Sequence, residues 1–276
     1  MNIDVSIIVP MYEGNKYINN IFDVFDNNQK YCSEKNLELI IVNDSPWVPL
    51  EIPNEHLGCN YRLVINKENL GIHRSRIAGL DAAKGDYIIF LDQDDVLEDS
   101  AVASQLEHIG IENAVVANGW VQDNRKQLRT LFKNKFQQAL VNRKSFYFYF
   151  GNPIASPGMC MMSRKCVPEA WKEQTLNNNG ADDWLLWVEY LFDGNRFSLN
   201  EDKIYEHINT GNNTSDDSSL MVESSVEALE NFSTIYSVNE NYRKAYINKL
   251  NIMKDRKYVE YIKHPCILFN LIKWKI

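Results

Sequence analysis

The sequence lacks the features that would assign it to several common protein classes. Its 276 residues contain no apolar run close to the ~20 residues that a membrane-spanning helix needs. The first ten residues begin a strand at once, without the charged segment and cleavage site of a signal peptide. The five cysteines, an odd number without a CxxC pair, are typical of reduced thiols and argue against a disulfide framework or a zinc site. We therefore expect a cytoplasmic protein.

Positive charge is also scarce, and it is unevenly spread. The formal net charge is −8, which argues against nucleic acid as a partner because generic nucleic-acid binding needs a basic face. From Arg243 to Ile276, however, nine Lys or Arg residues stand against two acids and alternate with aromatic and aliphatic residues. This composition predicts an interfacial segment on anionic lipid, at the inner face of the plasma membrane. The alternative is a packed helical hairpin whose basic face is solvated.

The most informative stretch is KGDYIIFLDQDDVLED, residues 84–99. Its β-branched and aromatic block, residues 87–91, predicts a buried strand. Three carboxylates follow at the carboxyl end of this strand: Asp92, Asp94 and Asp95. Close carboxylates repel one another and resist desolvation, so they favour a cation among them, and ligands of open α/β sheets bind at this edge. The stretch therefore predicts a divalent-metal site for an anionic substrate. The alternative is an acidic turn that caps a helix at 100–109.

Hydrophobic periodicity predicts an α/β protein. Apolar runs predict strands at residues 5–9, 37–42, 62–65 and 87–91. Helical spacing of apolar residues predicts helices at 17–25 and 70–83. This alternation is the pattern of a parallel sheet covered by helices. Further along, the pattern predicts a helix at 101–109, strands at 114–121, 128–132 and 159–162, and a helix from Asp182 onward.

The first strand-to-helix turn reads VPMYEGN and lacks the GxGxxG of dinucleotide binders, so it offers no phosphate nest. A nucleotide bound here would need its diphosphate neutralised elsewhere, and a metal on the acids at 92–95 could do this. After the second strand, Asp44 could accept an N–H from the base. A cap on the turn before Pro46 is the alternative role for that carboxylate.

A second acidic pair stands in GADDWLLW, where Gly180 breaks the chain and Asp182 and Asp183 open a helix. Two acids at a helix N-terminus can be simple capping and dipole stabilisation, worth ~0.3–1 kcal/mol each. On the residues alone, capping and catalysis both stay open. The polar segment 209–219 predicts a mobile loop, and we expect it to shape the acceptor side together with the Gly- and Pro-rich segment 145–158.

Taken together, four motifs in order resemble the inverting glycosyltransferases of family 2, from Val5 to Ser215. The motifs are SIIVPMYE, IIVNDSP, NLGIHRSRIAGLDAAKGDYIIFLDQDD and ADDWLLW. The resemblance implies the GT-A fold, an α/β architecture with a Rossmann-like, mostly parallel sheet flanked by helices. It implies a nucleotide-sugar-dependent domain at residues 1–220 and a helical, basic and aromatic extension at 221–276.

The resemblance also implies roles for individual residues. Asp183 falls on the catalytic base. Mn²⁺ or Mg²⁺ would be held by Asp94, Asp95 and His207. The nucleotide sugar would contact Pro10, Tyr12, Glu13, Asp44, Arg76, Asp92, Gln93 and Asp182. Two departures stand out: Asn43 replaces the first acid of the family's VDD motif, and the His207 position could align with Thr210 instead. A partly buried strand histidine is the alternative for His207.

The implied reaction moves a sugar from a nucleotide-diphosphate sugar, a UDP-sugar by default, to a hydroxyl of a saccharide acceptor. The acceptor would be a saccharide or a lipid-linked saccharide, and the enzyme a hexosyl- or N-acetylhexosaminyl-transferase in bacterial surface polysaccharide assembly. Asp183 would take the proton from the acceptor hydroxyl, and a single displacement would invert the anomeric carbon.

Two alternatives come from other classes. An apolar strand followed by DQDDV also resembles haloacid-dehalogenase-type phosphohydrolases, with Asp92 as nucleophile, Asp94 as acid and residues 181–183 as distal metal acids. That family usually has this motif on its first strand, whereas three predicted strands precede it here. A catalytically degenerate sugar-binding protein would require loss of the acids, and all of them are present.

Overall fold

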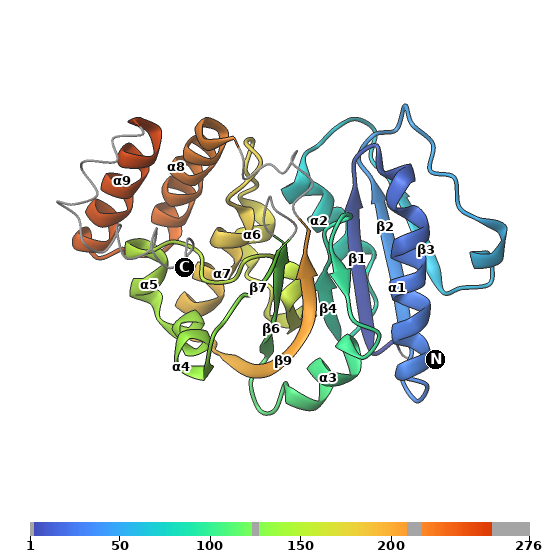
Figure 1. The fold of residues 1–276 in the computed structure, drawn as a ribbon. Helices are drawn as coiled ribbons and strands as arrows, with labels where there is room; N and C mark the ends of the chain where they lie inside the picture. Colours follow the sequence, from blue (N-terminus) through green and yellow to red (C-terminus); the bar gives the residue numbers. More distant parts are fainter. Residues whose placement is uncertain (1–2, 123–126, 209–216, 256–276) are drawn as a thin grey trace.

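The computed structural model describes residues 3–122, 127–208 and 217–255 (Figure 1). Most of the predicted mobile loop at 209–219, together with Thr210, lies outside the described residues. So does the part of the basic tail at 256–276. The interfacial prediction can therefore be compared with the structure only up to Asp255.

The N-terminal half is the predicted parallel sheet. Its strands lie in the order β3-β2-β1-β4, and each neighbouring pair is parallel. They are β1 (Val5–Met11), β2 (Leu37–Asn43), β3 (Tyr61–Ile65) and β4 (Tyr87–Phe90). Helices α1 (Ile18–Tyr31) and α2 (Ile72–Ala82) connect them and cover the sheet. Every residue of β1 and β2 is buried, which explains why both strands are almost continuously apolar in sequence.

Beyond β4 the sheet becomes mixed. It continues in the order β8-β6-β9-β5, with β7 paired to β6. These strands are β5 (Val96–Leu97), β6 (Ala114–Gln122), β7 (Leu128–Thr130), β8 (Cys160–Ser163) and β9 (Phe197–His207). Four of their five pairings, including β8 with β4, are antiparallel, and β6 with β9 is parallel. The predicted α/β architecture with flanking helices is confirmed, but the sheet is uniformly parallel only in its first half.

Strand β9 is an element that sequence periodicity did not predict. Its centre, LNEDK, interrupts the apolar pattern with exposed polar residues. It runs beside β6 and pairs with β5 directly after the acidic loop, where Val96 lies opposite Glu206. This pairing brings the end of β9, and with it His207, to the acids that follow β4.

Short helices and turns connect the remaining strands. They are η1 (Gly14–Tyr17), η2 (Asn54–His56), α3 (Ala101–His108), α4 (Lys135–Gln138), η3 (Ala139–Asn142), η4 (Pro157–Met159), η5 (Arg164–Cys166) and α6 (Glu169–Glu173). Two further helices matter for the site. Helix α5 (Lys144–Tyr149) is formed mainly by the aromatic segment SFYFYF, and helix α7 (Asp182–Phe192) begins at the second acidic pair.

The C-terminal helices α8 (Ser218–Ile235) and α9 (Glu240–Asp255) pack on the end of the molecule away from α1 (Figure 1). Helix α8 lies against α7, and α9 lies against α8 and α5. Trp184 of α7 stacks on Tyr246 of α9 with ring centroids 4.7 Å apart, and Phe148 of α5 stacks on Tyr242 at 5.3 Å. The domain boundary expected after residue 220 falls within the first turn of α8. Both C-terminal helices contribute to the same hydrophobic core as the sheet.

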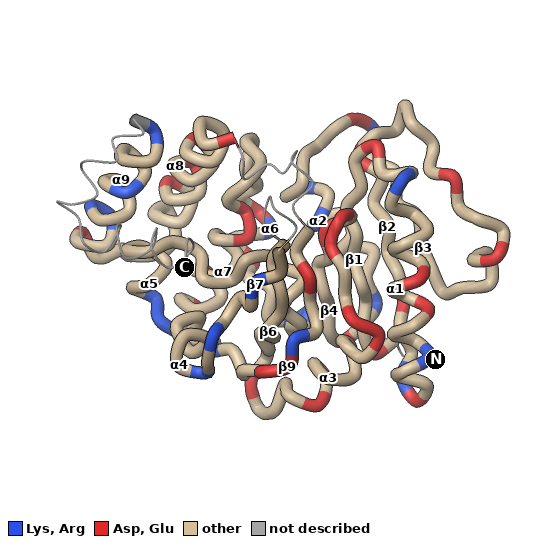
Figure 2. Tube along the Cα trace, viewed as in Figure 1, with Lys and Arg blue, Asp and Glu red and all other residues tan. Residues whose placement is uncertain are grey.

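The described part of the basic tail is thus a packed helix. Figure 2 shows its Lys and Arg along α9, and Arg243 and Lys244 are exposed while Tyr246 and Leu250 are buried. Up to Asp255 the tail therefore matches the packed-hairpin alternative. Across the part of the chain that the structure describes, no helix has the length and apolarity to cross a membrane.

One buried group in α7 opposes the stability of this core. Glu189 is fully buried, and neither of its carboxylate oxygens has a hydrogen-bond partner. Burial, with a smaller contribution from the charge of Asp193, raises the pKa of Glu189 to about 8. The folded protein therefore holds a proton on Glu189 at pH values where the unfolded chain has released it.

We predict that Glu189→Gln removes a loss of stability that develops in the wild type as pH rises from about 4.5 to about 8. Because the folded pKa of Glu189 lies above its unfolded value, this residue lowers stability progressively as pH rises from about 4.5 to about 8, by ~3 kcal/mol at neutral pH. The free energy of unfolding, measured with urea across this range, should show a growing advantage of the variant as pH rises. Glu230→Gln on the exposed face of α8 is the matched control and should show no such trend. A constant difference between variant and wild type would contradict the prediction.

Candidate active site

The site is organised by a buried arginine that joins two acidic segments far apart in sequence. Arg76 lies in α2, and its side chain is only 5% exposed. One terminal nitrogen donates to Asp92 Oδ1 at 2.5 Å, and the other donates to Asp182. Asp92 follows β4 and Asp182 begins α7, so one guanidinium holds the acidic loop and the second acidic pair together. Its planar fork suits such a bridge, which a single ammonium could not span as well.

The charges of this centre strongly affect one another. Burial alone lowers the pKa of Arg76, but the carboxylates of Asp182 and Asp92 outweigh burial and raise it above its ordinary value. Burial raises the pKa of Asp92, against the opposing effect of Arg76. Arg76 thus offsets part of the effect of burial on Asp92, while the crowding of further acids leaves excess negative charge in the site.

Asp183, predicted as the catalytic base, sits next to this bridge at the start of α7 and is partly exposed. Its Oδ1 accepts from the backbone N–H of Trp184 at 2.6 Å, and its Oδ2 accepts from Asn152 Nδ2 at 2.8 Å. Burial and then the charge of Asp182 raise the pKa of Asp183 to about 7, although Arg76 opposes them. A carboxylate oriented by two donors and half-ionised near neutral pH has the properties of a general base.

Asp95, predicted as a metal ligand, lies behind the site. It is fully buried and accepts hydrogen bonds on both carboxylate oxygens. The donors are Tyr205 Oη, His207 Nδ1 at 2.9 Å, the backbone N–H of Ile208 at 3.0 Å and Ser156 Oγ at 3.3 Å. A cation could reach Asp95 only by displacing these donors. The structure therefore favours Asp95 as the residue that fixes the end of β9, instead of a direct ligand.

Asp94 and His207 are better placed to hold a metal. Asp94 is partly exposed, and burial followed by the charges of Asp95 and Asp92 raises its pKa to about 6. Crowded carboxylates of this kind favour a cation among them. His207 uses Nδ1 on Asp95, so Nε2 is the ring nitrogen left for a ligand. This carboxylate–histidine arrangement is the usual support of a metal-binding imidazole. Burial lowers the pKa of His207, but the hydrogen bond and charge of Asp95 raise it to about 9.

Carboxylate oxygens are the donors that suit Mn²⁺ and Mg²⁺. Asp94, Asp95 and His207 do not form a closed group, however. Among the described residues, one group of three side chains of metal-ligand type has its ligand atoms within 4.8 Å of one another. That group contains none of Asp94, Asp95 and His207. A cation here would need further oxygen ligands, which a bound diphosphate can supply.

Tyr12 and Gln93 lock the first strand-to-helix turn to the acidic loop. Tyr12 N–H donates to Gln93 Oε1 at 3.1 Å, and Gln93 Nε2 donates to the Tyr12 carbonyl at 3.3 Å. Glu13 adopts a left-handed φ of 48° and donates its N–H to Ser45 Oγ at 2.9 Å. The Tyr12 ring is 45% exposed and packs edge-on against Trp47, itself 55% exposed, at 6.0 Å. This open aromatic pair is suited to a flat ligand such as a base.

Two other predicted nucleotide contacts are mainly internal. Pro10 is buried within β1 opposite Val42. Asp44 is only 5% exposed and accepts from Asn66 Nδ2 at 2.7 Å and from the N–H groups of Leu70 at 2.8 Å and Gly71 at 2.9 Å. Asp44 thus anchors the loop before α2 and does not cap the turn before Pro46. Its contact with a base stays a prediction.

The structure adds site residues that sequence reasoning missed. Asn152 orients Asp183, Ser156 donates to Asp92 Oδ2 at 3.2 Å as well as to Asp95, and Tyr205 binds Asp95. Asn152 and Ser156 come from the Gly- and Pro-rich segment that was expected on the acceptor side. No spacing rule in the sequence connects these residues to the acids, because β8 and β9 bring them there only in the folded sheet.

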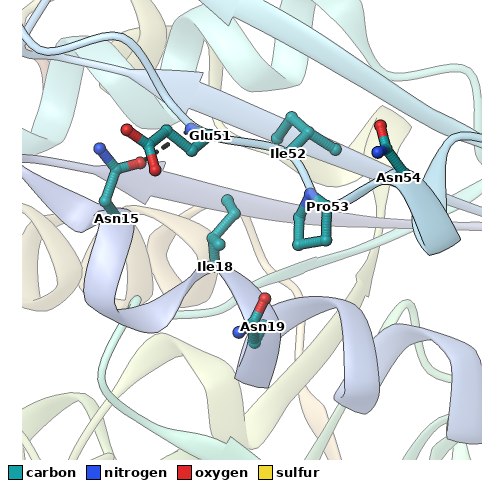
Figure 3. Close-up of a pocket in the computed structure, with 7 residues that line it drawn as sticks. All are labelled: Asn15, Ile18, Asn19, Glu51, Ile52, Pro53 and Asn54. Atoms are coloured by element: carbon teal, nitrogen blue, oxygen red, sulfur yellow. Dashed lines mark hydrogen bonds between the residues drawn. The ribbon is translucent and has the colours of Figure 1, made fainter.

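A cavity of about 360 Å³ opens beside α1 (Figure 3). It is lined by Asn15, Ile18, Asn19, Glu51, Ile52, Pro53 and Asn54. The N–H of Glu51 donates to Asn15 Oδ1 at 2.9 Å and closes one side. No predicted site residue lines it, so this cavity is distinct from the acidic centre.

Comparison with known proteins identifies relatives of the N-terminal part. The model of "Glycosyl transferase family 2" matches residues 6–171. The putative glycosyltransferase EpsH of Bacillus subtilis is 33% identical over 114 residues, which are 41% of this chain and 32% of EpsH. The chain thus matches about a third of the length of this curated relative.

Solved structures with the same fold extend over nearly the whole chain. TarS 1–349 of S. aureus in complex with UDP-GlcNAc has a TM-score of 0.58 at 16% identity, covering 89% of this chain and 79% of TarS. The mannosyltransferase PcManGT from Pyrobaculum calidifontis, in complex with GDP-Man and Mn²⁺, has a TM-score of 0.62 at 15% identity, covering 99% and 75%. At such identities the likeness concerns the fold alone.

We predict that Arg76→Lys destabilises the protein by roughly 2–4 kcal/mol, because one ammonium cannot replace both hydrogen bonds and leaves a buried carboxylate poorly paired. The free energy of unfolding by urea measures this loss. Arg74→Lys on the same helix is the control, since Arg74 binds the neutral side chains of Thr175 and Asn177. Equal stability of the two variants would contradict the bridging role of Arg76.

Proposed function

The chain belongs to glycosyl transferase family 2, and on that premise we propose that it transfers a sugar from a nucleotide-diphosphate sugar to a hydroxyl of a saccharide acceptor, with inversion. The observation that carries this proposal is the Arg76 bridge. By joining Asp92 to Asp182, it places a metal-type acidic loop and an oriented candidate base, Asp183, in one centre. An inverting transferase needs both parts: a place for the leaving diphosphate and a base for the attacking hydroxyl.

The donor side would be formed by the loops after β1, β2 and β4. Asp94 and His207 Nε2 would hold Mn²⁺ or Mg²⁺, with Asp95 fixing the His207 ring from behind. When bound, the cation neutralises charge on the leaving diphosphate. Tyr12 and Trp47 would flank the nucleobase of the donor. Asp92, held by Arg76 and Ser156, would face the ribose. A UDP-sugar is the default donor; the fold is shared both with TarS in its UDP-GlcNAc complex and with PcManGT in its GDP-Man complex, so it supports a nucleotide-sugar donor without choosing the nucleotide.

The acceptor side would be served by Asp183. Its carboxylate takes the proton of the acceptor hydroxyl while that oxygen attacks the anomeric carbon. The bond from this carbon to the diphosphate breaks on the opposite face, and the electron pair leaves with the diphosphate. Asn152 and the Trp184 N–H would keep the carboxylate turned to the acceptor, and the negative charge of Asp182 would keep Asp183 basic, while Arg76 limits that effect.

The cellular setting proposed for this reaction is bacterial surface polysaccharide assembly in the cytoplasm, with a saccharide or lipid-linked saccharide as acceptor. The similarity to EpsH supports a glycosyltransferase but names no sugar. Contact of the tail with an anionic membrane surface would depend on residues beyond Asp255. The phosphohydrolase alternative has no support, because the acidic loop follows the fourth strand of a sheet shared with glycosyltransferases. The presence of Asp92, Asp94, Asp182 and Asp183 argues against a degenerate binding protein.

We predict that Asp183→Asn retains donor binding but lowers transfer ~100-fold or more, since the amide cannot accept the acceptor proton. Calorimetry with a panel of UDP- and GDP-sugars and Mn²⁺ first identifies the donor. Release of the nucleoside diphosphate in the presence of acceptor sugars, with and without a chelator, then measures transfer.

Asp193→Asn at the other end of α7 is the matched control and should keep full transfer activity. Near-normal transfer by Asp183→Asn would reject the assignment of the base. Turnover of phosphomonoesters that Asp92→Asn abolishes would instead reject the transferase.

The pH dependence of transfer offers an independent test. With a pKa of about 7, Asp183 becomes ionised as pH rises, so kcat should increase up to about pH 7 and then level off; one pH unit below the pKa it should be about tenfold lower. Asn152→Ala removes a donor to the ionised carboxylate and should shift this profile to higher pH. Steady-state rates at saturating donor measure both profiles, and an unshifted profile in Asn152→Ala would contradict the orienting role.

A further inference from the structure

Outside the acidic centre, three side chains of metal-ligand type converge between α1 and the segment that joins β2 to β3. They are Asp26, His56 and Cys59, and one potential ligand atom of each lies within 4.8 Å of the other two. Asp26 lies in α1, His56 ends η2, and Cys59 follows in the next turn. All three stand apart in chain and fold from α7 and β9, which complete the acidic centre.

The geometry already resembles part of a tetrahedral ligand set. Asp26 Oδ2 lies 3.2 Å from His56 Nδ1, and Asp26 Oδ1 lies 3.0 Å from Cys59 Sγ. Around Zn²⁺, bonds of ~2.0–2.3 Å to oxygen, nitrogen and sulfur place neighbouring ligand atoms about 3.3–3.6 Å apart. The two distances involve different oxygens of Asp26, and one ligand atom from each residue lies within 4.8 Å of the other two, so an ion would draw these atoms together by about 1 Å at most.

The site is also rigid and accessible on one side. The His56 ring stacks on Phe22 with centroids 4.5 Å apart and planes 10° apart, and Phe22 packs edge-on against Tyr61. A backbone hydrogen bond from Cys59 N–H to the His56 carbonyl, 3.0 Å long, turns the chain so that both side chains face α1. The Asp26 side chain is 29% exposed, which leaves room for an ion to enter and for a water as fourth ligand.

The donor set distinguishes this cluster from the acidic centre. A thiol, an imidazole and one carboxylate select zinc-like ions, whereas Mg²⁺ and Mn²⁺ prefer oxygen-rich sites. Burial and the neighbouring Asp26 raise the pKa of the Cys59 thiol to about 11. The thiol therefore stays protonated and donates a hydrogen bond to Asp26. A bound divalent ion would release that proton, as it does at other cysteine sites.

We propose that Asp26, His56 and Cys59 form a second metal site, which binds Zn²⁺ or a similar transition-metal ion and fastens the segment between β2 and β3 to α1. That segment carries Trp47 beside the proposed base site and residues 51–54 in the wall of the cavity (Figure 3). The ion has a structural role, and the proposal stands independently of the transferase function.

The test is titration of the full chain, reduced and stripped of metal, with Co²⁺. A thiolate-to-cobalt charge-transfer band should appear in the near ultraviolet, saturate at one equivalent and disappear when Zn²⁺ is added. Cys59→Ser and His56→Gln should abolish the band or weaken binding at least ~10-fold. Cys166→Ser, at another partly buried cysteine, and Asp94→Asn, in the acidic centre, should retain it.

A second measurement guards against a variant that fails to fold. Zn²⁺ should raise the thermal midpoint of the wild type and of Asp94→Asn but not that of Cys59→Ser, whose helical content is checked by circular dichroism. Absence of a thiolate band in the wild type, or its persistence in Cys59→Ser, would overturn the proposal. Because Asp94→Asn separates the two metal sites, failure here leaves the proposed transferase untouched, and the reverse also holds.

Discussion

The buried Arg76 bridge is the interaction on which the rest of the site depends. Asp92 and Asp182 lie 90 residues apart in the chain, on the loop after β4 and on the first turn of α7, and each would repel the other without the guanidinium between them. The surrounding contacts complete this arrangement: Ser156 joins Asp92 to Asp95, Tyr205 and His207 attach β9, and Asn152 orients Asp183. The site is therefore built where the parallel half of the sheet meets the mixed half.

The same crowding of charge tunes the reactive groups. Asp183 is close to half-ionised at neutral pH because burial and Asp182 raise its pKa while Arg76 limits the rise. Asp94 carries raised proton affinity for a related reason, with Asp95 and Asp92 beside it. Such raised pKa values within one cluster of acids are typical of functional sites, where local stability is sacrificed for chemistry. Arg76 limits this loss of stability by pairing with Asp92 and Asp182.

The sequence was most informative where the pattern is local. The apolar runs of β1, β2 and β4 are buried on both faces, so their periodicity predicted the parallel half and the acids at its edge. Strand β9 was not predicted because its polar centre interrupts the apolar pattern of a strand. Its pairing with β6 and β5 arises only in the folded sheet. The role of Asp95 escaped for the same reason: three of its four partners, Tyr205, His207 and Ile208, come from the end of β9 and the residue after it. Residues that meet through long-range pairing leave no spacing signal.

The aromatic packing of α8 and α9 on α7 has a consequence for biosynthesis. Trp184 directly follows Asp183, and its ring lies against Tyr246, near the end of the described chain. A nascent chain can complete all nine strands before α8 and α9 have left the ribosome, yet the helix that presents Asp183 then lacks its outer layer. Docking of α8 and α9 therefore couples the helix that carries Asp183 to a part of the chain that is synthesised after the sheet.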